Sequence, residues 1–180
     1  YDPLDGHLDP SGTTNAYAKA ARLGGAEIVL RNPVKALTPR ADGTWDVVTE
    51  QGTVHAEHVV NAAGLWAREV GAMVGAVPPL HPMEHQYLVT DDIPLVYEHG
   101  SELPHVMDPA GESYLRQEGR GLCIGFYEQA CKPWAVEGTP WNFGHELLPD
   151  DFDKINDSIE FAYRRFPVLQ SAGVKSVIHG

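Results

Sequence analysis

The chain has 180 residues, of which 43% are hydrophobic and 21% are charged, and its formal net charge is −12. This size and composition are typical of a globular chain that forms one or two compact lobes, and they exclude a disordered tail. The acidic charge is spread along the sequence, which argues against nucleic acid as a partner. No apolar run approaches the roughly 20 residues of a membrane-spanning helix, so we expect no membrane span.

The first predicted element is a helix that begins at Pro10, a residue tolerated at the first helical position. Asp9 is the expected N-cap, and apolar residues follow at helical spacing until the glycine pair that starts at Gly24. Residues 26–30 then read as a short buried strand. Together these elements form the helix-strand half of a βαβ unit whose first strand would precede Tyr1.

A three-stranded β-meander is predicted between Val34 and Ala56. Two hairpin dipeptides, Asp42-Gly43 and Gln51-Gly52, divide this stretch into strands, and apolar and polar residues alternate along the middle strand. We interpret the meander as an insertion between elements of a parallel sheet.

The segment Val59–Gly71 is the most informative part of the sequence. An apolar run breaks into the small residues Ala62-Ala63-Gly64 and restarts with helical spacing at Trp66. This pattern predicts a buried strand, a tight turn and a helix, an arrangement whose turn commonly lies beside a cofactor. Small residues there let the backbone approach a ligand, although close packing of a strand on a helix requires them as well.

Pro78-Pro79 marks a boundary, so we assign residues 1–77 to one lobe and residues 78–180 to a second lobe. In the second lobe, short strands alternate with connections rich in Pro and Gly. We expect two adjacent strands at 114–117 and 124–127, with the glycines between them closing a hairpin.

The last predicted element is a helix capped by Asp150 or Asp151 and stopped by Pro167. Two arginines suit its C-terminal end, and its apolar residues recur at helical spacing. Its expected role is packing, through the stripe Phe152, Ile155, Ile159, Ala162 and Phe166.

The run His81-Pro82-Met83-Glu84-His85 formally matches a zinc-peptidase signature that requires both histidines on one helix. Pro82 opposes a helix, and the residues after His85 favour a strand, so we rank a zinc hydrolase low and expect no metal. On a strand, His85 and Tyr87 share one face and together line a polar pocket wall. The two cysteines, Cys123 and Cys131, also match no metal spacing, and we expect reduced thiols.

Several segments, in the same order along the chain, resemble the flavin-dependent amine oxidoreductases of the D-amino acid oxidase-like superfamily. The similarity is closest to the dimethylglycine and sarcosine dehydrogenases, and it covers the chain essentially from end to end. The segments that carry it are 61–71 (Asn-Ala-Ala-Gly-Leu-Trp-Ala-Arg-Glu-Val-Gly), 5–10 (Asp-Gly-His-Leu-Asp-Pro), 42–47 (Asp-Gly-Thr-Trp-Asp-Val), 85–90 (His-Gln-Tyr-Leu-Val-Thr) and 114–118 (Tyr-Leu-Arg-Gln-Glu).

Enzymes of this kind open with a strand, turn and helix that carry Gly-x-Gly-x-x-Gly for the FAD pyrophosphate, and this sequence lacks that motif. We therefore expect an interior piece of a larger enzyme, inactive by itself. The resemblance implies an α/β fold with an α+β mixture. Residues 1–77 would be part of a glutathione-reductase-like FAD-binding lobe with an inserted β-meander, and residues 78–180 an antiparallel-sheet substrate lobe.

The activity implied by the resemblance is FAD-dependent oxidation of the N-methyl C–N bond of a small amino acid such as dimethylglycine or sarcosine. The iminium that results would meet water, or tetrahydrofolate in a separate domain. The implied partners are the N-methylated amino acid and the rest of the polypeptide, and the isolated fragment is expected to self-associate. The location would be cytoplasmic in a bacterium and the mitochondrial matrix in a eukaryote.

The resemblance also assigns catalytic and substrate-binding residues. His85 and Tyr87 would handle protons and position the substrate, whereas without the resemblance both read as satisfied strand residues. Tyr114 and Tyr127 are candidate pocket walls, and Arg116 is a candidate anchor for the substrate carboxylate. An arginine on a half-exposed strand more often forms a surface ion pair, and that alternative stays open.

For the cofactor, the resemblance implies that backbone atoms of the small-residue turn approach FAD, while a tryptophan packs against its edge. A residue on the first meander strand would offer backbone groups to the adenine. The predicted cofactor-binding residues are Val34, Ala62, Ala63, Gly64 and Trp66.

Two other function classes compete with the amine dehydrogenase. One is a non-catalytic module, derived from the same fold, that binds a small molecule or a partner. The other is a different FAD oxidoreductase, of the glycerol-3-phosphate or D-amino acid type.

Overall fold

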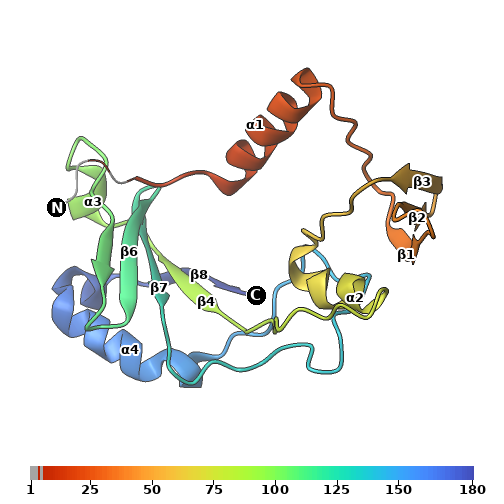
Figure 1. Cartoon of the computed structure of the whole chain (residues 1–180). Coiled ribbons are helices and arrows are strands. Elements are labelled where there is room, and N and C mark those ends of the chain that lie inside the picture. Colours follow the sequence, from red (N-terminus) through yellow and green to blue (C-terminus); the bar gives the residue numbers. More distant parts are fainter. Residues whose placement is uncertain (1–3, 5) are drawn as a thin grey trace. The chain divides into compact units, whose positions relative to one another are not determined.

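A computed structural model describes Leu4 and residues 6–180, and the chain divides into two compact units. The first unit ends at Pro79 and the second runs Leu80–Gly180 (Figure 1). The roles that we assigned to the two lobes remain predictions. Asp5, part of one segment that carries the family resemblance, lies outside the described residues.

Helix α1 (Pro10–Leu23) forms as predicted. The Asp9 side chain caps it by accepting a hydrogen bond from the backbone N–H of Gly12, and the N–H of Gly24 donates to the carbonyl of Ala20 at its other end. None of the helical residues is buried within this chain. The helix is therefore held by its caps and its own hydrogen bonds rather than by packing.

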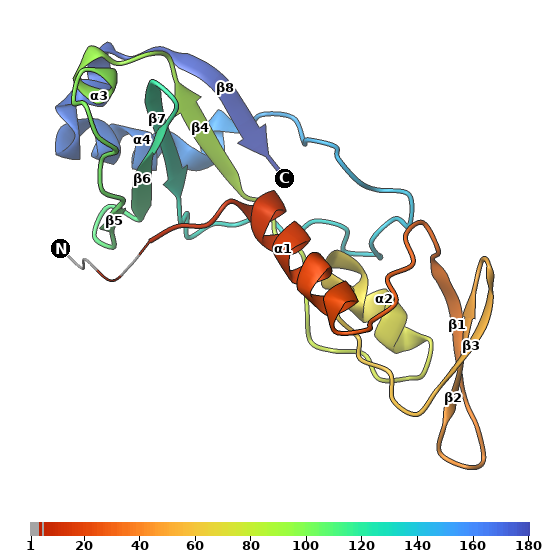
Figure 2. The same ribbon diagram turned by 90° about the horizontal axis from the view of Figure 1, so that it is seen from above.

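The predicted meander is confirmed in the first unit (Figure 2). Strands β1 (Val34–Pro39), β2 (Trp45–Thr49) and β3 (Gly52–Ala56) pair antiparallel in the order β1-β2-β3. Gly43 and Gly52 supply the positive φ angles that the two turns require, +85° and +141°.

Two predicted strands of the first unit are wrong. Residues 26–30 and 59–61 adopt no regular structure, and Leu30 and Val60 are 71% and 86% exposed. Both runs are apolar enough to suggest burial, but a strand needs a hydrogen-bonded neighbour, and among the described residues neither run pairs with another strand. The helix after the second run does form, as the short 3₁₀ turn η1 (Gly64–Trp66) followed by α2 (Ala67–Ala72).

The second unit is a five-stranded antiparallel sheet in the order β5-β6-β7-β4-β8. The hairpin predicted near residue 119 joins β6 to β7, and Gly119, with φ of +58°, occupies its two-residue turn. The strands are β4 (Gln86–Thr90), β5 (Val106–Asp108), β6 (Ser113–Glu118), β7 (Gly121–Phe126) and β8 (Val174–His179), and a short helix α3 (Pro94–Tyr97) follows β4.

Helix α4 (Phe152–Arg165) covers one face of this sheet (Figure 1). Of the two predicted caps, Asp151 is the one that accepts a hydrogen bond, from the N–H of Lys154. The predicted apolar stripe is confirmed in its centre, where Ile155 and Ala162 are fully buried, whereas Phe152 at its start is exposed. Pro167 ends the helix and begins the 3₁₀ segment η2 (Pro167–Ser171). The core of the unit lies between α4 and one face of the sheet.

Candidate active site

Three predicted site residues lie on the sheet face opposite α4. Tyr87 on β4 is in register with Gly125 on β7, which is in register with Tyr114 on β6. Arg116 pairs with Cys123 in the next row of the same face. Because residues directly opposite each other on neighbouring strands point to the same side, Tyr87, Tyr114 and Arg116 project from one surface.

Gly125, which sequence reasoning did not select, makes this arrangement possible. A Cβ atom placed on Gly125 would overlap the ring of Tyr114, so the phenol lies directly over the glycine backbone. A glycine inside a strand is the signal that could have found it, since it marks the close approach of another group. The gap at residue 125 thus lets Tyr114 lean toward β4.

The remaining predicted residues of the second unit extend the same aromatic set. The rings of Tyr114 and Tyr127 are 5.6 Å apart between centroids, and those of Tyr127 and His85 are 6.2 Å apart and nearly parallel. His85 continues the ladder beyond β4, exchanging both backbone hydrogen bonds with Gly180. The structure therefore brings His85, Tyr87, Tyr114 and Tyr127 together, as one group of aromatic side chains with polar atoms.

Burial controls the protonation of this face. It raises the pKa of the Tyr114 hydroxyl, and the neighbouring Cys123 and Tyr127 raise it further, so Tyr114 is a neutral hydrogen-bond donor near pH 7. Burial also raises the pKa of the Cys123 thiol, which makes a reactive thiolate there unfavourable. Both cysteines are free, as expected.

Arg116 forms an ion pair in this structure. Burial is the largest single influence on its guanidinium and lowers the pKa, but the hydrogen bond to Glu118 and the nearby Cys123, Glu118 and Tyr87 together outweigh it, so the net shift of the pKa is upward. Nη1 also donates to the carbonyl of Gln117 at 3.3 Å. Anchoring a substrate carboxylate, as predicted, would therefore require Arg116 to exchange Glu118 for the ligand.

The histidine run that resembles a zinc-peptidase signature is not helical. Residues 81–85 form no helix, and Met83 makes an isolated antiparallel bridge to Pro133. The two histidines therefore do not sit one helical turn apart, which that zinc site requires. Among the described residues, no group of three His, Cys, Asp or Glu side chains is placed to hold a metal.

The turn at residues 62–64 leaves its backbone open. Gly64 has φ of +55°, and apart from Gly64 and its two chain neighbours no heavy atom of the described residues lies within 4 Å of the position that a Cβ would take there. Asn61, which the sequence did not mark as important, fixes the turn: its Nδ2 donates to the carbonyl of Ala67 at 2.8 Å, and its Oδ1 accepts from the N–H of Ala63 at 3.3 Å. Of the other predicted cofactor residues, Val34 begins β1 and Trp66 ends η1, both half-buried.

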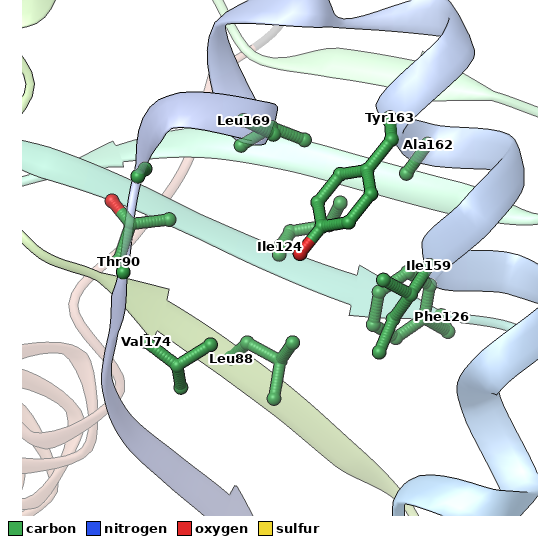
Figure 3. Close-up of a pocket in the computed structure, with 11 residues that line it drawn as sticks. Leu88, Thr90, Ile124, Phe126, Ile159, Ala162, Tyr163, Leu169 and Val174 are labelled. Carbon is green, nitrogen blue, oxygen red and sulfur yellow. The ribbon is translucent and has the colours of Figure 1, made fainter.

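The second unit also has an apolar pocket, on the other face of its sheet (Figure 3). It lies between α4, η2 and the strands and contains about 310 Å³ of space, part of it open to solvent. Its walls include Leu88 and Ile124, the strand neighbours of Tyr87 and Gly125, so it lies across the sheet from the aromatic group. With only the hydroxyls of Thr90 and Tyr163 among its side-chain polar groups, this pocket lacks a strong acid or base.

A family model described as "FAD dependent oxidoreductase", DAO, matches residues 1–180. The chain belongs to the DAO family. Over its full length it is 48% identical to mouse dimethylglycine dehydrogenase and 36% identical to mouse sarcosine dehydrogenase, both described as mitochondrial. The chain spans about a fifth of the length of these relatives, 21% and 20% respectively.

The fold of this DAO-family chain also matches solved structures. L-proline dehydrogenase from P. horikoshii superimposes with a TM-score of 0.76 at 24% identity, over 99% of this chain and 45% of that chain. At this identity the likeness shows the fold alone. The predicted fold class, a mixture of helices with an antiparallel sheet in a flavoenzyme fold, is confirmed, and so is the family resemblance.

Membership of the DAO family implies FAD, and the residues at the turn fit such a group. Small side chains at Ala62 and Ala63, together with the open space beside Gly64, leave the backbone accessible to a ligand. This openness holds although the strand expected before the turn does not form. In the described residues no helix is both long and apolar enough to cross a membrane.

Proposed function

We propose that this chain is part of an FAD-dependent oxidoreductase that oxidises the N-methyl C–N bond of a small amino acid such as dimethylglycine or sarcosine. The observation that carries the proposal is the aromatic row of the second unit, in which Tyr87, Gly125 and Tyr114 lie side by side on the sheet face opposite α4. The two dehydrogenases to which the chain is similar support the substrate class.

FAD, when bound, supplies the chemistry of accepting a hydride equivalent from the N-methyl carbon. Backbone groups of Val34, Ala62, Ala63 and Gly64 would hold the dinucleotide, with Trp66 against its edge. The open backbone beside Gly64 supports this assignment.

His85 and Tyr87 act on the substrate nitrogen. An N-methyl amine has to be unprotonated to react, so the site needs a group that takes a proton from it. The imidazole of His85 is 43% exposed and is held against the Tyr127 ring, which suits it for proton exchange with a bound amine. Tyr87, two residues further along the same face, positions the amine.

The other aromatic residues shape the substrate pocket. Tyr114 and Tyr127 form apolar walls that exclude water, and the neutral Tyr114 hydroxyl donates a hydrogen bond to a carboxylate oxygen. Arg116 then binds the substrate carboxylate in place of Glu118.

The same proposal includes the fate of the one-carbon unit, the partner of this chain and the cellular location of the enzyme. The one-carbon unit released from the substrate passes to water or to tetrahydrofolate held by a separate domain, and the rest of the polypeptide is the main partner of this chain. The isolated chain is inactive and self-associates. The enzyme works in the mitochondrial matrix if the source is a eukaryote, in line with the relatives described as mitochondrial, and in the cytoplasm if it is a bacterium.

The test is an anaerobic titration of the full-length polypeptide that contains this chain. Dimethylglycine and sarcosine should bleach its flavin absorbance, and Tyr87→Phe should slow the bleaching. Tyr97→Phe is the matched control, because Tyr97 lies outside the aromatic group and stacks with Arg120. Bleaching only by phosphorylated polyols would favour the glycerol-3-phosphate type, and a protein that carries no flavin would favour a non-catalytic module.

A further inference from the structure

A buried carboxylate lies directly behind His85. The side chain of Glu128 is 4% exposed, and its Oε2 is 3.5 Å from Nδ1 of His85. Its Oε1 is 3.1 Å from Nζ of Lys154, whose side chain is 2% exposed. Within the part of the chain that the structure describes, neither carboxylate oxygen has a partner at hydrogen-bond geometry.

Packing alone gives no reason for this arrangement. Removing a carboxylate and an ammonium from water costs several kcal/mol for each ion, and two apolar side chains of similar size often stabilise a fold equally well. Lys154 offsets the charge of Glu128 from one side only. The other carboxylate oxygen, Oε2, faces the half-exposed imidazole of His85. An ion pair that served only to stabilise the fold would not need this second polar neighbour.

The frame around the pair is rigid. Lys154 belongs to the first turn of α4, and its Nζ also donates to the carbonyl of Glu84, the residue before His85, at 3.1 Å. The start of α4 is tied to β4 as well, because Oε1 of Gln86 accepts from the N–H of Asp151 and Nε2 of Gln86 donates to its carbonyl. Glu128 and His85 are therefore fixed relative to each other by the same helix.

We propose that Glu128 is a positioning residue for His85, with Lys154 holding its carboxylate in place. The inference rests on the proposed function and deepens it. In this role the Glu128 carboxylate accepts a hydrogen bond from Nδ1–H of His85, which selects one tautomer and leaves the lone pair on Nε2 directed away from the carboxylate. The substrate ammonium loses its proton to Nε2, and the positive charge of the imidazolium that forms is compensated by Glu128.

The other charged groups near His85 do not lie beside its Nδ1 atom as Glu128 does. Glu84, its chain neighbour, has Oε2 3.5 Å from Nε2 of His179. Asp151 pairs with Lys132. Tyr127 contributes its ring face rather than a charge. Glu128 is thus the acidic group that faces the imidazole.

The experiment removes both charges at once in the full-length flavoprotein. Glu128→Gln alone would strand a buried ammonium and endanger folding. The double variant Glu128→Gln/Lys154→Met avoids this cost: it removes the carboxylate behind His85 together with the ammonium that pairs with it and that ammonium's hydrogen bond to Glu84. We expect flavin content and thermal stability close to wild type, with the second-order rate constant of anaerobic flavin reduction by dimethylglycine lowered about tenfold or more. The acid limb of its pH profile should move to lower pH, because the imidazolium loses its counter-charge.

A matched control breaks another ion pair between α4 and the sheet. Arg165 Nε lies 2.9 Å from Asp108 Oδ2, away from His85, so Asp108→Asn/Arg165→Met should leave the rate and the pH profile unchanged. A third variant, His85→Asn, distinguishes the positioning role of Glu128 from the catalytic role of His85 on which it depends. If His85→Asn slows flavin reduction while Glu128→Gln/Lys154→Met reacts as wild type, the role of Glu128 is overturned and the proposed function stands. If His85→Asn itself reacts as wild type, the catalytic role of His85 is overturned, and that of Glu128 with it.

Discussion

Gly125 has a role that depends on the absence of a side chain. The Tyr114 ring occupies the space above the backbone of Gly125. It thereby leans from β6 across β7 toward β4, the strand that carries Tyr87. This arrangement depends on the register of three strands. The amino-acid sequence shows that residue 125 is a glycine inside a predicted strand, but it does not show which aromatic side chain packs over that glycine.

Gly125→Ala should displace the Tyr114 ring. The new methyl group would overlap that ring, and overpacking of this kind costs about 1–3 kcal/mol. We expect a lower unfolding temperature and, in the full-length flavoprotein, weaker binding of dimethylglycine in an anaerobic titration. Gly144→Ala is the control, since nothing lies within 4 Å of its Cβ position, and it should change neither quantity. Unaltered binding by Gly125→Ala would mean that the Tyr114 ring does not contact the substrate.

Other residues escape sequence reasoning for a similar reason. Glu128 follows a strand like any surface acid, and its significance comes from Lys154, 26 positions away along the chain, and from His85, which directly precedes β4. His85 and Tyr87 could be named as candidates because they are two residues apart in one predicted extended segment, where alternation alone puts them on one face.

At the scale of elements, the features that the sequence predicted correctly are those that neighbouring residues determine. Asp9 and Asp151 cap their helices, and Gly43 and Gly119 sit in their turns, because each interaction closes within a few residues. The strands at 26–30 and 59–61 were predicted from apolar runs alone. A strand exists only beside a partner, and no partner for them occurs among the described residues.

The contact between β5 and the end of α4 should make stability depend on pH. The Arg165 guanidinium holds the pKa of the Asp108 carboxyl below its usual range, so the folded state binds this proton less tightly than the unfolded state. The stability that results is present above the unfolded value of about 3.9 and is lost as the pH falls through the lower folded value. Asp108→Asn should therefore reduce stability near neutral pH and flatten its decline in acid.

The predicted pH dependence of stability in Asp108→Asn can be checked by thermal unfolding, followed by circular dichroism, between about pH 7 and pH 3. Asp157→Asn, an exposed change on α4, serves as the control and should keep the wild-type slope. If the stability of Asp108→Asn declined in acid as steeply as that of the wild type, the Asp108–Arg165 pair would not contribute to the pH dependence of stability.

At the scale of the whole molecule, the two units differ in how well they bury their apolar residues. The second unit encloses a core of buried side chains between α4 and its sheet. In the first unit, Leu23, Leu30 and Val60 are 82%, 71% and 86% exposed, and α1 has no buried residue. Two of these side chains, Leu30 and Val60, belong to the segments that failed to form strands.

The isolated chain should therefore self-associate, against the repulsion of its net charge of −12. Repulsion between exposed charges extends over a Debye length, about 30 Å at 0.01 M salt but only about 8 Å at 0.15 M. Apolar contact does not weaken in this way, so association should increase as salt is added. Light scattering across that salt range measures the association, and the preparation should be colourless.

Leu30→Ser/Val60→Ser tests whether the exposed apolar segments are the cause. Both side chains already face solvent, so the change should not unfold the chain, and it should lower the scattering at 0.15 M salt. Glu27→Ser/Glu57→Ser is the matched control, with two exposed acids close to the same positions, and it should raise the scattering slightly by removing negative charge. A wild-type chain that stays monomeric at about 0.15 M salt would contradict the prediction that these exposed segments drive self-association, and a yellow preparation would contradict the prediction that the isolated chain carries no flavin.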